Sequence, residues 1–287
     1  MDIVSTSNRI LRRVARLVPA TSPVRLKLAA HWNSFISSRG SIAVEINGDS
    51  YTLRPEYRSF TPEYETAIYH PLKTLLAHMD CFVDVGANFG LYSLLAARVA
   101  PPDAAIVSIE ANPYTYEVLR AHLELNGASG RAAAMNLAAT EASGQHVRFL
   151  AEPGLAGNPC ARISTAGDVG VIVATVALDD VDALRQSTRC LIKIDVEGAE
   201  LGVLRGGRRT LSCDSAPILL LAVHPALLRE FGASPEGVYQ ELARAGYCVL
   251  DEHGRAATVL EFAEYWCVPK DARDRFLREA GFERADD

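Results

Sequence analysis

Short apolar runs alternate with segments of helical periodicity over most of the chain. Apolar strands are expected at 81–85, 105–109, 131–138, 171–176, 190–195 and 218–223. Helices with apolar residues three or four positions apart are expected at 62–77, 114–125, 235–245 and 271–280. This repeated strand–helix order is typical of a parallel sheet. Two later runs, 247–250 and 262–268, are expected to be antiparallel neighbours at one sheet edge.

The start of the chain follows a different pattern, so two domains are expected, at 1–61 and 62–287. Apolar and polar residues alternate at 42–46 and again at 50–53, on either side of Asn47-Gly48. Alternation around an Asn-Gly pair is the strongest short-range signal of a β-hairpin. The first domain is therefore interpreted as a basic helical arm followed by a hairpin.

Charge divides the chain in the same way. Residues 1–40 carry seven basic side chains against Asp2, whereas the whole chain has a net charge of −6, so the remainder carries −12. The amphipathic helices expected at 5–36 fit either a membrane-surface or partner-docking arm, or a basic helix packed on the acidic body or on another subunit. The second interpretation is favoured because the arm is short and its first helix lacks Trp, and a homodimer is one such assembly. An acidic body argues against nucleic acid as the main partner.

Composition favours a cytoplasmic protein. The six cysteines lie far apart without a C-x-x-C pair, which indicates reduced core residues in place of a disulfide or zinc framework. No run of about 18 apolar residues occurs, and the first residues do not have the pattern of a secretory signal.

The most informative stretch runs from Cys81 to Leu95. An apolar strand is followed by a turn with Gly86 and Gly90 and then by an apolar helix, an arrangement typical of a nucleotide-binding corner. The spacing differs from G-x-G-x-x-G because position 91 is Leu. Asp84 near the strand end would repel a pyrophosphate but attract an ammonium and a sulfonium. The residues therefore favour S-adenosylmethionine over NAD.

A second acid follows the next strand at the spacing that a nucleoside site requires. Glu110 lies 24 residues after Gly86, and an acid about 20 residues beyond the glycine turn binds the ribose hydroxyls of a nucleoside. Asn136, near the end of the third strand, fits either a contact with the adenine edge or a plain turn residue. Residues 140–170, rich in Gly, Ala and Pro, are interpreted as a lid or substrate loop.

Further polar residues end the fourth and fifth strands. Asp195 joins Asp84 and Glu110 at the carboxyl edge of the sheet, where ligands of parallel sheets bind. This gathering of acids suits a cationic cofactor, a sugar or a metal. Glu197 and Glu200 fit solvated acids or helix caps. His224 fits either a general base for a hydroxyl or a helix cap.

These stretches together resemble the FkbM family of S-adenosylmethionine-dependent methyltransferases. The matching residues are 82–93, 108–113, 177–180, 192–201, 204–207, His224-Pro225 and Gly246-Tyr247. The resemblance covers roughly residues 62–270. It implies the Rossmann-like class I methyltransferase fold, an α/β fold with a seven-stranded, mostly parallel sheet, one antiparallel strand near its edge and helices on both faces.

The resemblance also implies site residues and an activity. The implied reaction is O-methylation of a hydroxyl of a small molecule or glycan, often a sugar or a polyketide. By residue, it implies that Asp84, Gly86, Asn88 and Gly90 hold the methionine end of the cofactor, that Glu110 holds the ribose, and that Asp195 lies beside the methyl group. Family members often carry an acid where this chain has Ala222, so no metal ligand is assigned.

The expected mechanism is in-line methyl transfer in which a base takes the proton of the acceptor hydroxyl. Asp195 or His224 is the candidate base, with Glu197 as support. One alternative is an NAD-linked oxidoreductase or epimerase, which Glu110 fits but Asp84 does not. The other is a non-catalytic nucleoside-binding protein, for which Ala222 is the only hint.

Overall fold

The computed structural model describes residues 40–57, 62–149 and 170–282. The chain divides into two compact units, one that ends at Thr66 and one that begins at Ala67. The expected helical arm and most of the expected substrate loop lie outside the described residues. Within the described ranges, no helix combines the length and the apolar character that a membrane crossing requires.

The first unit contains the expected hairpin. Strands β1 (Ile42–Ile46) and β2 (Asp49–Leu53) pair antiparallel across Asn47 and Gly48. Both turn residues have positive φ, 49° and 82°, which is the geometry that an Asn-Gly pair adopts in a tight hairpin. A short 3₁₀ turn, η1 (Pro55–Tyr57), follows. The prediction from the alternating pattern is confirmed.

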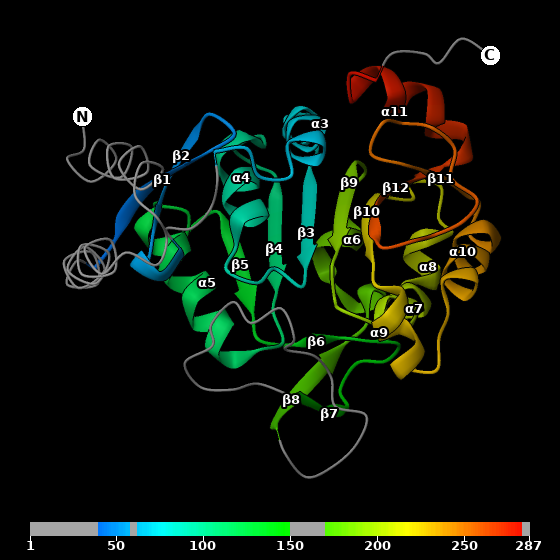
Figure 1. The fold of residues 1–287 in the computed structure, drawn as a ribbon, viewed down its shortest axis with the longest axis horizontal. Helices are drawn as coiled ribbons and strands as arrows, with labels where there is room; N and C mark the ends of the chain where they lie inside the picture. Colours follow the sequence, from blue (N-terminus) through cyan, green and yellow to red (C-terminus); the bar gives the residue numbers. More distant parts are fainter. Residues whose placement is uncertain (1–39, 58–61, 150–169, 283–287) are drawn as a thin grey trace, which may run out of the picture. The chain divides into compact units, whose positions relative to one another are not determined.

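The second unit is built on a seven-stranded sheet with the order β11-β12-β10-β9-β3-β4-β5. Its strands are β3 (Cys81–Val85), β4 (Ala105–Ile109), β5 (Ala132–Met135), β9 (Cys190–Ile194), β10 (Ile218–Val223), β11 (Tyr247–Leu250) and β12 (Ala263–Pro269). Only β12 runs antiparallel to its two neighbours in this sheet. The predicted α/β fold, with an antiparallel strand next to the edge of a parallel sheet, is confirmed (Figure 1).

Helices connect and cover these strands. They are α3 (Thr66–Leu76), α4 (Leu91–Val99), α5 (Pro113–Leu125), α6 (Asp182–Gln186), α7 (Glu200–Arg205), α8 (Arg208–Leu211), α9 (Pro225–Glu230), α10 (Pro235–Arg244) and α11 (Arg273–Glu279), with 3₁₀ turns η2 (Leu178–Asp180) and η3 (Lys270–Ala272). Helices α4 and α6 each contact both β3 and β4. Asp84 of β3 bonds to α4, whereas Val83 packs in the cluster that contains Leu184 of α6. Because successive strand side chains point to opposite faces, the two helices cover opposite faces.

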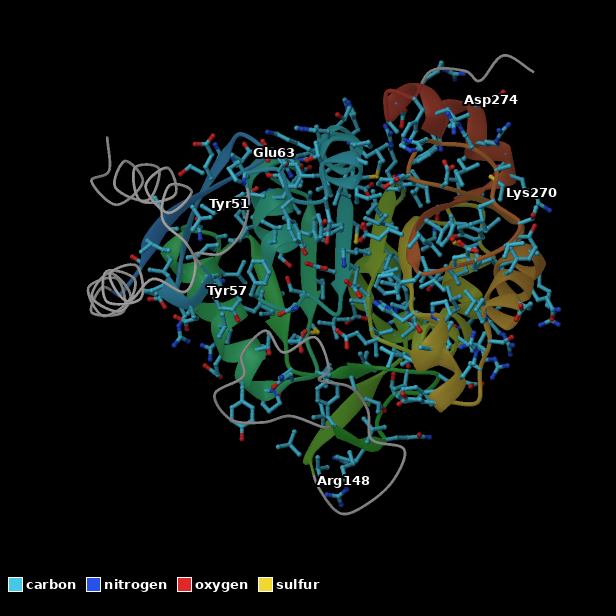
Figure 2. All side chains as sticks on the ribbon, in the orientation of Figure 1. Tyr51, Tyr57, Glu63, Arg148, Lys270 and Asp274 are labelled. Carbon is cyan, nitrogen blue, oxygen red and sulfur yellow. The ribbon has the colours of Figure 1, made fainter. Side chains whose placement is uncertain are left out.

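Side chains fill the space between the sheet and its helices (Figure 2). On the α6 side, residues such as Ile192, Leu204 and Leu219 form one apolar core with the inner faces of α7, α8 and α10. Charged residues such as Lys270 of η3 and Asp274 of α11 lie exposed at the surface. Cys81, Cys190 and Cys267 are buried free thiols, as expected for reduced core residues, whereas Cys248 is half-buried and Cys213 is exposed, so these two do not fit that expectation.

The third predicted strand, 131–138, is wrong in its extent. It divides into β5 and a short strand, β6 (Ala138–Ala139), which joins β8 (Val171–Val176) and β7 (His146–Phe149) in a separate three-stranded sheet. The division falls at Asn136, whose side chain bonds to backbone carbonyls beyond the end of β4. The chain leaves the main sheet there because the neighbouring strand has already ended.

Candidate active site

A row of polar side chains crosses the middle of the main sheet. Ser108, Asp84 and Lys193 are register neighbours on β4, β3 and β9. Ser93 of α4 donates a hydrogen bond to Asp84 Oδ2 at 2.6 Å and accepts one from Ser108 at 2.7 Å. Asp84 is 1% exposed, and its Oδ1 has no hydrogen-bond partner in the part of the chain that the structure describes.

Lys193 supplies the positive charge of this row. Its Nζ lies 2.9 Å from Asp195 Oδ2 and 5.1 Å from the centre of the Tyr92 ring, although the residue is only 3% exposed. Burial alone would lower the pKa of Lys193, but the charges of Asp195, Glu264 and Asp84 raise that pKa overall. The lysine therefore stays charged and balances the acids at the strand ends.

The two acids respond differently to this environment. Burial would raise the pKa of Asp195, but the charge and hydrogen bond of Lys193 lower that pKa below its usual value. Burial raises the pKa of Asp84, and Lys193 opposes this only in part. Asp195 is therefore the carboxylate that Lys193 holds ionised at the edge of the sheet.

Gly86 allows the ends of β3 and β9 to meet. Its φ is +78°, and a Cβ at this position would lie 1.8 Å from the backbone oxygen of Asp195. The backbone N–H of Asp195 also donates to the carbonyl of Val85 at 2.9 Å. Gly90 has a different role: it starts α4 with a φ of +92°, and a Cβ there would overlap Leu119. Both glycines are required by backbone geometry and close packing.

Glu110 connects the glycine turn to the tip of β4. Its two carboxylate oxygens accept hydrogen bonds from the backbone N–H groups of Asn88 and Asn112, both at 2.8 Å. The residue is 7% exposed, and burial raises the pKa of Glu110 to about 7 despite these hydrogen bonds. The acid that follows β4 therefore fixes the turn that follows β3, although the two lie far apart in the sequence.

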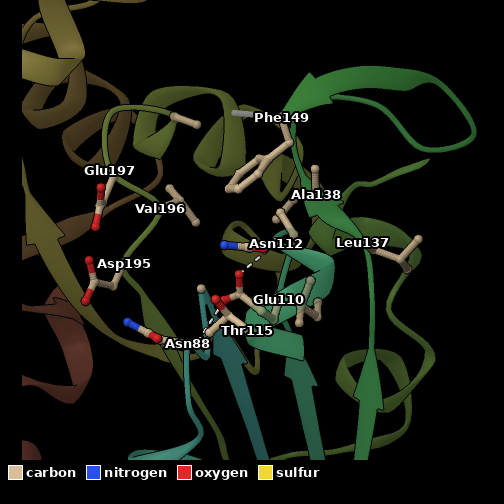
Figure 3. A pocket seen from close by; sticks show the side chains of 15 residues that line it. Asn88, Glu110, Asn112, Thr115, Leu137, Ala138, Phe149, Asp195, Val196 and Glu197 are labelled. Atoms are coloured by element: carbon tan, nitrogen blue, oxygen red, sulfur yellow. Dashed lines mark hydrogen bonds between the residues drawn. The ribbon is translucent and has the colours of Figure 1, made fainter. Parts of the chain in front are cut away.

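A pocket of about 660 Å³, counted with its open mouth, lies above these strand ends. Figure 3 shows Asp195 and Glu197 on one side and Phe149, Ala138 and Leu137 on the other, with Glu110 between them. One side is therefore acidic and the other apolar. Such a pocket can hold a ligand with a cationic end, hydroxyl groups and a flat apolar end.

His224 lies beside Asp195, directly after β10. Its Nε2 is 3.8 Å from Asp195 Oδ1, and its Nδ1 is 2.8 Å from Glu200 Oε1. The ring of Phe262 packs edge-on against the imidazole, with ring centres 5.4 Å apart. Burial would lower the pKa of His224, but the hydrogen bond to Glu200 and the charges of Asp195, Glu200 and Glu197 raise that pKa overall.

The structure brings most of the predicted site residues together. Gly86, Asn88, Glu110, Asp195 and Glu197 line the pocket. His224 does not line the pocket itself but lies next to Asp195, which does. The carboxyl ends of β3, β4, β9 and β10 thus meet at one site, as the strand order requires.

Three predicted residues lie elsewhere. Asp84 is beneath the pocket floor, because strand alternation points its side chain toward Ser93 of α4. Gly90 packs against α5. Asn136 donates from Nδ2 to the carbonyls of Glu110 and Ala111, so its amide holds the end of β4, and its contact with an adenine stays a prediction.

Sequence reasoning missed two buried charged residues. Lys193 interrupts an apolar strand two positions before Asp195, a spacing that places both side chains on one face and would have revealed the pair. The interpretation of Glu200 as a solvated acid is wrong, because the residue is 0% exposed and bound to His224. Ala222, the departure from the family pattern, is paired in register with Glu264 on the adjacent strand β12.

No cluster of three or more His, Cys, Asp or Glu side chains able to bind a metal ion is found among residues 40–57, 62–149 and 170–282. The polar groups instead form pairs: Lys193 with Asp195, and His224 with Glu200. The site can therefore accept a proton and balance positive charge through its own side chains.

The chain was compared with known proteins. No curated protein matches it. Similar solved structures include a precorrin-6y C5,15-methyltransferase from Geobacter metallireducens (14% identity, 73% of this chain and 88% of that chain, TM-score 0.41). A second is a SAM-dependent methyltransferase from Agrobacterium tumefaciens (12% identity, 80% of this chain and 70% of that chain, TM-score 0.42). A third is an O-methyltransferase from Bacillus cereus in complex with SAH (9% identity, 90% of this chain and 96% of that chain, TM-score 0.35). The fold assignment rests on the sheet order described above.

The profile of the methyltransferase FkbM domain matches residues 84–249. The match begins at Asp84, continues through the glycine turn and Glu110, and includes Asp195 and His224. It covers more than half of the chain. The chain therefore belongs to the FkbM family of methyltransferases, and its cofactor is S-adenosylmethionine.

Proposed function

We propose that the protein transfers the methyl group of S-adenosylmethionine to a hydroxyl oxygen of a small molecule or glycan. The observation that carries the proposal is the pair formed by His224 and Asp195: Asp195 lines the acidic side of the pocket, and His224 Nε2 lies 3.8 Å from Asp195 Oδ1. A hydroxyl must lose its proton as it attacks a methyl group, and these two side chains are candidate proton acceptors on the pocket's acidic side, next to Glu197.

The pocket fits the cofactor in charge and in shape. We assign the ribose hydroxyls to Glu110, whose oxygens point into the pocket between its acidic and apolar sides. Leu137, Ala138 and Phe149 supply apolar surface for the adenine. Asp195 and Glu197 supply negative charge for the ammonium and sulfonium, a lining that would repel the pyrophosphate of NAD.

The turn after β3 completes the site. We assign the methionine end to the backbone of Gly86 and Asn88, with Gly90 fixing the start of α4 behind them. Asp84 acts indirectly: it lies beneath the pocket and bonds to Ser93 of α4, so it supports the start of the helix that follows the turn. Asn136 supports Glu110 by holding the carbonyl that ends β4.

S-adenosylmethionine supplies an electrophilic methyl group when it is bound. The protein's residues then orient the acceptor oxygen toward that group, exclude water and receive the proton. Positioning of two reactants in this way supplies several kcal/mol of barrier reduction, about 7–11 kcal/mol in the most favourable systems. The base is His224 or Asp195, with Glu197 in support.

The stability of the methylated product in alkali tests whether the methyl group is transferred to a hydroxyl oxygen. The protein is incubated with cofactor labelled in the methyl group and with two probe sets, methyl glycosides and hydroxylated macrolactones. The proposal predicts label in a methyl ether, which survives mild alkali. Label found only in an alkali-labile ester or in a methylamine would contradict hydroxyl transfer. Cofactor binding without transfer to either set favours the non-catalytic nucleoside-binding alternative.

A further inference from the structure

We propose that Glu200 is a positioning residue for His224: it holds the imidazole with the proton on Nδ1, so that Nε2 is the atom that takes the acceptor's proton. The proposal rests on the hydroxyl-directed reaction proposed above and assigns its base. It is carried by the contact between the two side chains, in which Oε1 of the fully buried Glu200 lies 2.8 Å from Nδ1 of the partly buried His224.

The contact determines which ring nitrogen carries the proton. A carboxylate oxygen can only accept, so Nδ1 of His224 must donate to Glu200. In the neutral ring, Nε2 then has a free lone pair. Its nearest acidic neighbour, Asp195 Oδ1, is 3.8 Å away, which is longer than a hydrogen bond. The lone pair therefore stays available to an acceptor hydroxyl.

Glu200 is fixed by its surroundings. It is 0% exposed, and its Oε1 also accepts a hydrogen bond from the backbone N–H of Gly198 at 3.0 Å. Gly198 in turn packs so closely that a Cβ would lie 2.9 Å from Leu227 and Phe231, in and just after α9. Because α9 begins directly after His224, the turn that leads into Glu200, the first residue of α7, packs against the helix that follows His224.

Asp195 is unsuited to the same task. Its Oδ2 is bound to Lys193 Nζ at 2.9 Å, and the charge of that lysine lowers the pKa of Asp195 despite burial. A carboxylate with a lowered pKa is a weak base. His224, by contrast, faces Glu200, Asp195 and Glu197, whose charges stabilise its protonated form, and the Phe262 ring, which is uncharged.

The proton transfer balances in atoms and charge. The acceptor oxygen forms a bond to the methyl carbon, the carbon–sulfur bond breaks, and its electron pair goes to sulfur. The hydroxyl proton moves to Nε2, which leaves an imidazolium whose Nδ1–H still donates to Glu200. A buried carboxylate behind the ring stabilises that imidazolium as the reaction proceeds.

Nitrogen NMR of histidine-labelled protein tests the proposal without an acceptor. The His224 signals are assigned by comparison with His224→Asn. In the wild type, Nδ1 of His224 is expected to carry the proton in the neutral ring. Glu200→Gln keeps an acceptor oxygen but removes the charge, so the titration midpoint of His224 is expected to fall by about one pH unit. Glu200→Leu removes the acceptor and is expected to move the proton to Nε2.

Glu241→Gln is the matched control, since Glu241 is another buried glutamate, which lies on α10 and is paired with Arg208 of α8. It should leave the His224 signals unchanged. A wild-type proton on Nε2, or a His224 midpoint that is the same in wild type and Glu200→Gln, would overturn the proposal. The Gln variant keeps this test usable even where the Leu variant does not fold.

Activity and cofactor binding separate this proposal from the proposed function. Glu200→Gln should bind S-adenosylhomocysteine like the wild type, because Glu200 does not line the pocket. On an acceptor that the wild type methylates, its kcat should fall about 10–100-fold with KM unchanged, the range expected for losing part of a general base's 10²–10⁴-fold contribution. If Nδ1 of His224 carries the proton but the protein methylates no hydroxyl, the proposed function is wrong while the Glu200–His224 contact is confirmed.

Discussion

Glu110 Oε2 accepts a hydrogen bond from the backbone N–H of Asn88 at 2.8 Å, across 22 residues of sequence. The acid at the tip of β4 therefore holds the glycine turn after β3 in its positive-φ geometry. Asn88 itself has a φ of +50°, a conformation that non-glycine residues adopt in few places. The same carboxylate lines the pocket, so the shape of the turn and the proposed ribose contact depend on one side chain.

Replacement of this carboxylate should weaken cofactor binding. Glu110→Ala removes the proposed acceptor of the ribose hydroxyls, and loss of hydrogen bonds to a charged group costs about 1.5–3 kcal/mol. The dissociation constant of S-adenosylhomocysteine should rise by about 10–100-fold in calorimetry. Glu117→Ala, which removes an exposed carboxylate on α5, should bind like the wild type. Equal affinity in Glu110→Ala and wild type would contradict the assignment.

Binding of S-adenosylhomocysteine should also depend on pH. Burial raises the pKa of Glu110 to about 7. The ionised carboxylate is the better acceptor for two hydroxyl groups, so affinity should increase as pH rises through about 7 and level off above it. Calorimetry at about pH 6 and about pH 8 measures the change. Glu110→Gln, which cannot ionise, should lose this dependence; a dependence that persists in this variant would mean that another group titrates.

The same pKa predicts a change in the stability of the ligand-free protein. A carboxyl whose folded pKa lies above its unfolded value binds the proton more tightly when folded. Its contribution to the free energy of unfolding is therefore present below the unfolded pKa of about 4.5 and lost as pH rises to about 7. Urea unfolding of wild type and Glu110→Gln should show a difference that changes over this range and stays constant above it. A constant difference throughout would argue against the raised pKa.

Gly86 should be the least replaceable residue of the turn. In Gly86→Ala the new Cβ would meet the backbone oxygen of Asp195 at 1.8 Å, and the residue would also keep a φ of +78°. Gly127→Ala is a matched control, because its φ is +67° and nothing lies within 4 Å of its Cβ. The control should lose about 1–2 kcal/mol of unfolding free energy from backbone strain alone. Gly86→Ala should lose clearly more unfolding free energy than this control. Equal losses in the two variants would show that the ends of β3 and β9 can move apart without loss of stability.

Lys193→Met should destabilise the fold by about 3–5 kcal/mol at neutral pH, because Asp84 and Asp195 lose the cation that balances them. Without the lysine, the folded pKa values of these acids rise. The deficit should therefore shrink as pH falls and the acids take up protons. Urea unfolding at several pH values measures this. As a control, Lys270→Met replaces an exposed lysine and should change the free energy of unfolding little. A loss of stability in Lys193→Met that does not vary with pH would indicate lost packing in place of lost charge.

Much of the fold could be predicted from local pattern. The strands β3, β4 and β9 are apolar except for one polar residue each, β10 is wholly apolar, and the Asn47-Gly48 turn is flanked by alternating residues. Such signals depend on neighbours in sequence. The division of 131–138 into two strands depends on Asn136 bonding to the carbonyl of Glu110, a contact between distant segments that no local pattern contains.

The site divides in the same way between what local sequence shows and what it hides. Glu110 and Asp195 could be placed at the pocket because acids that directly follow parallel strands lie at the carboxyl edge of the sheet. Asp84 comes one residue before its strand ends, and its side chain turns away from the pocket toward Ser93. Glu200 reads as a surface acid at a helix start, and only the approach of His224 from a later strand gives it a buried partner.

We expect the pocket above Gly86 and Glu110 to bind a methionine-linked nucleoside. The decisive measurement is calorimetric titration of the wild type with S-adenosylhomocysteine and, separately, with NAD at about pH 8. We expect S-adenosylhomocysteine to bind with a dissociation constant on the order of micromolar and NAD to show no measurable binding. Binding of NAD without binding of S-adenosylhomocysteine would show that the pocket is not a site for S-adenosylmethionine.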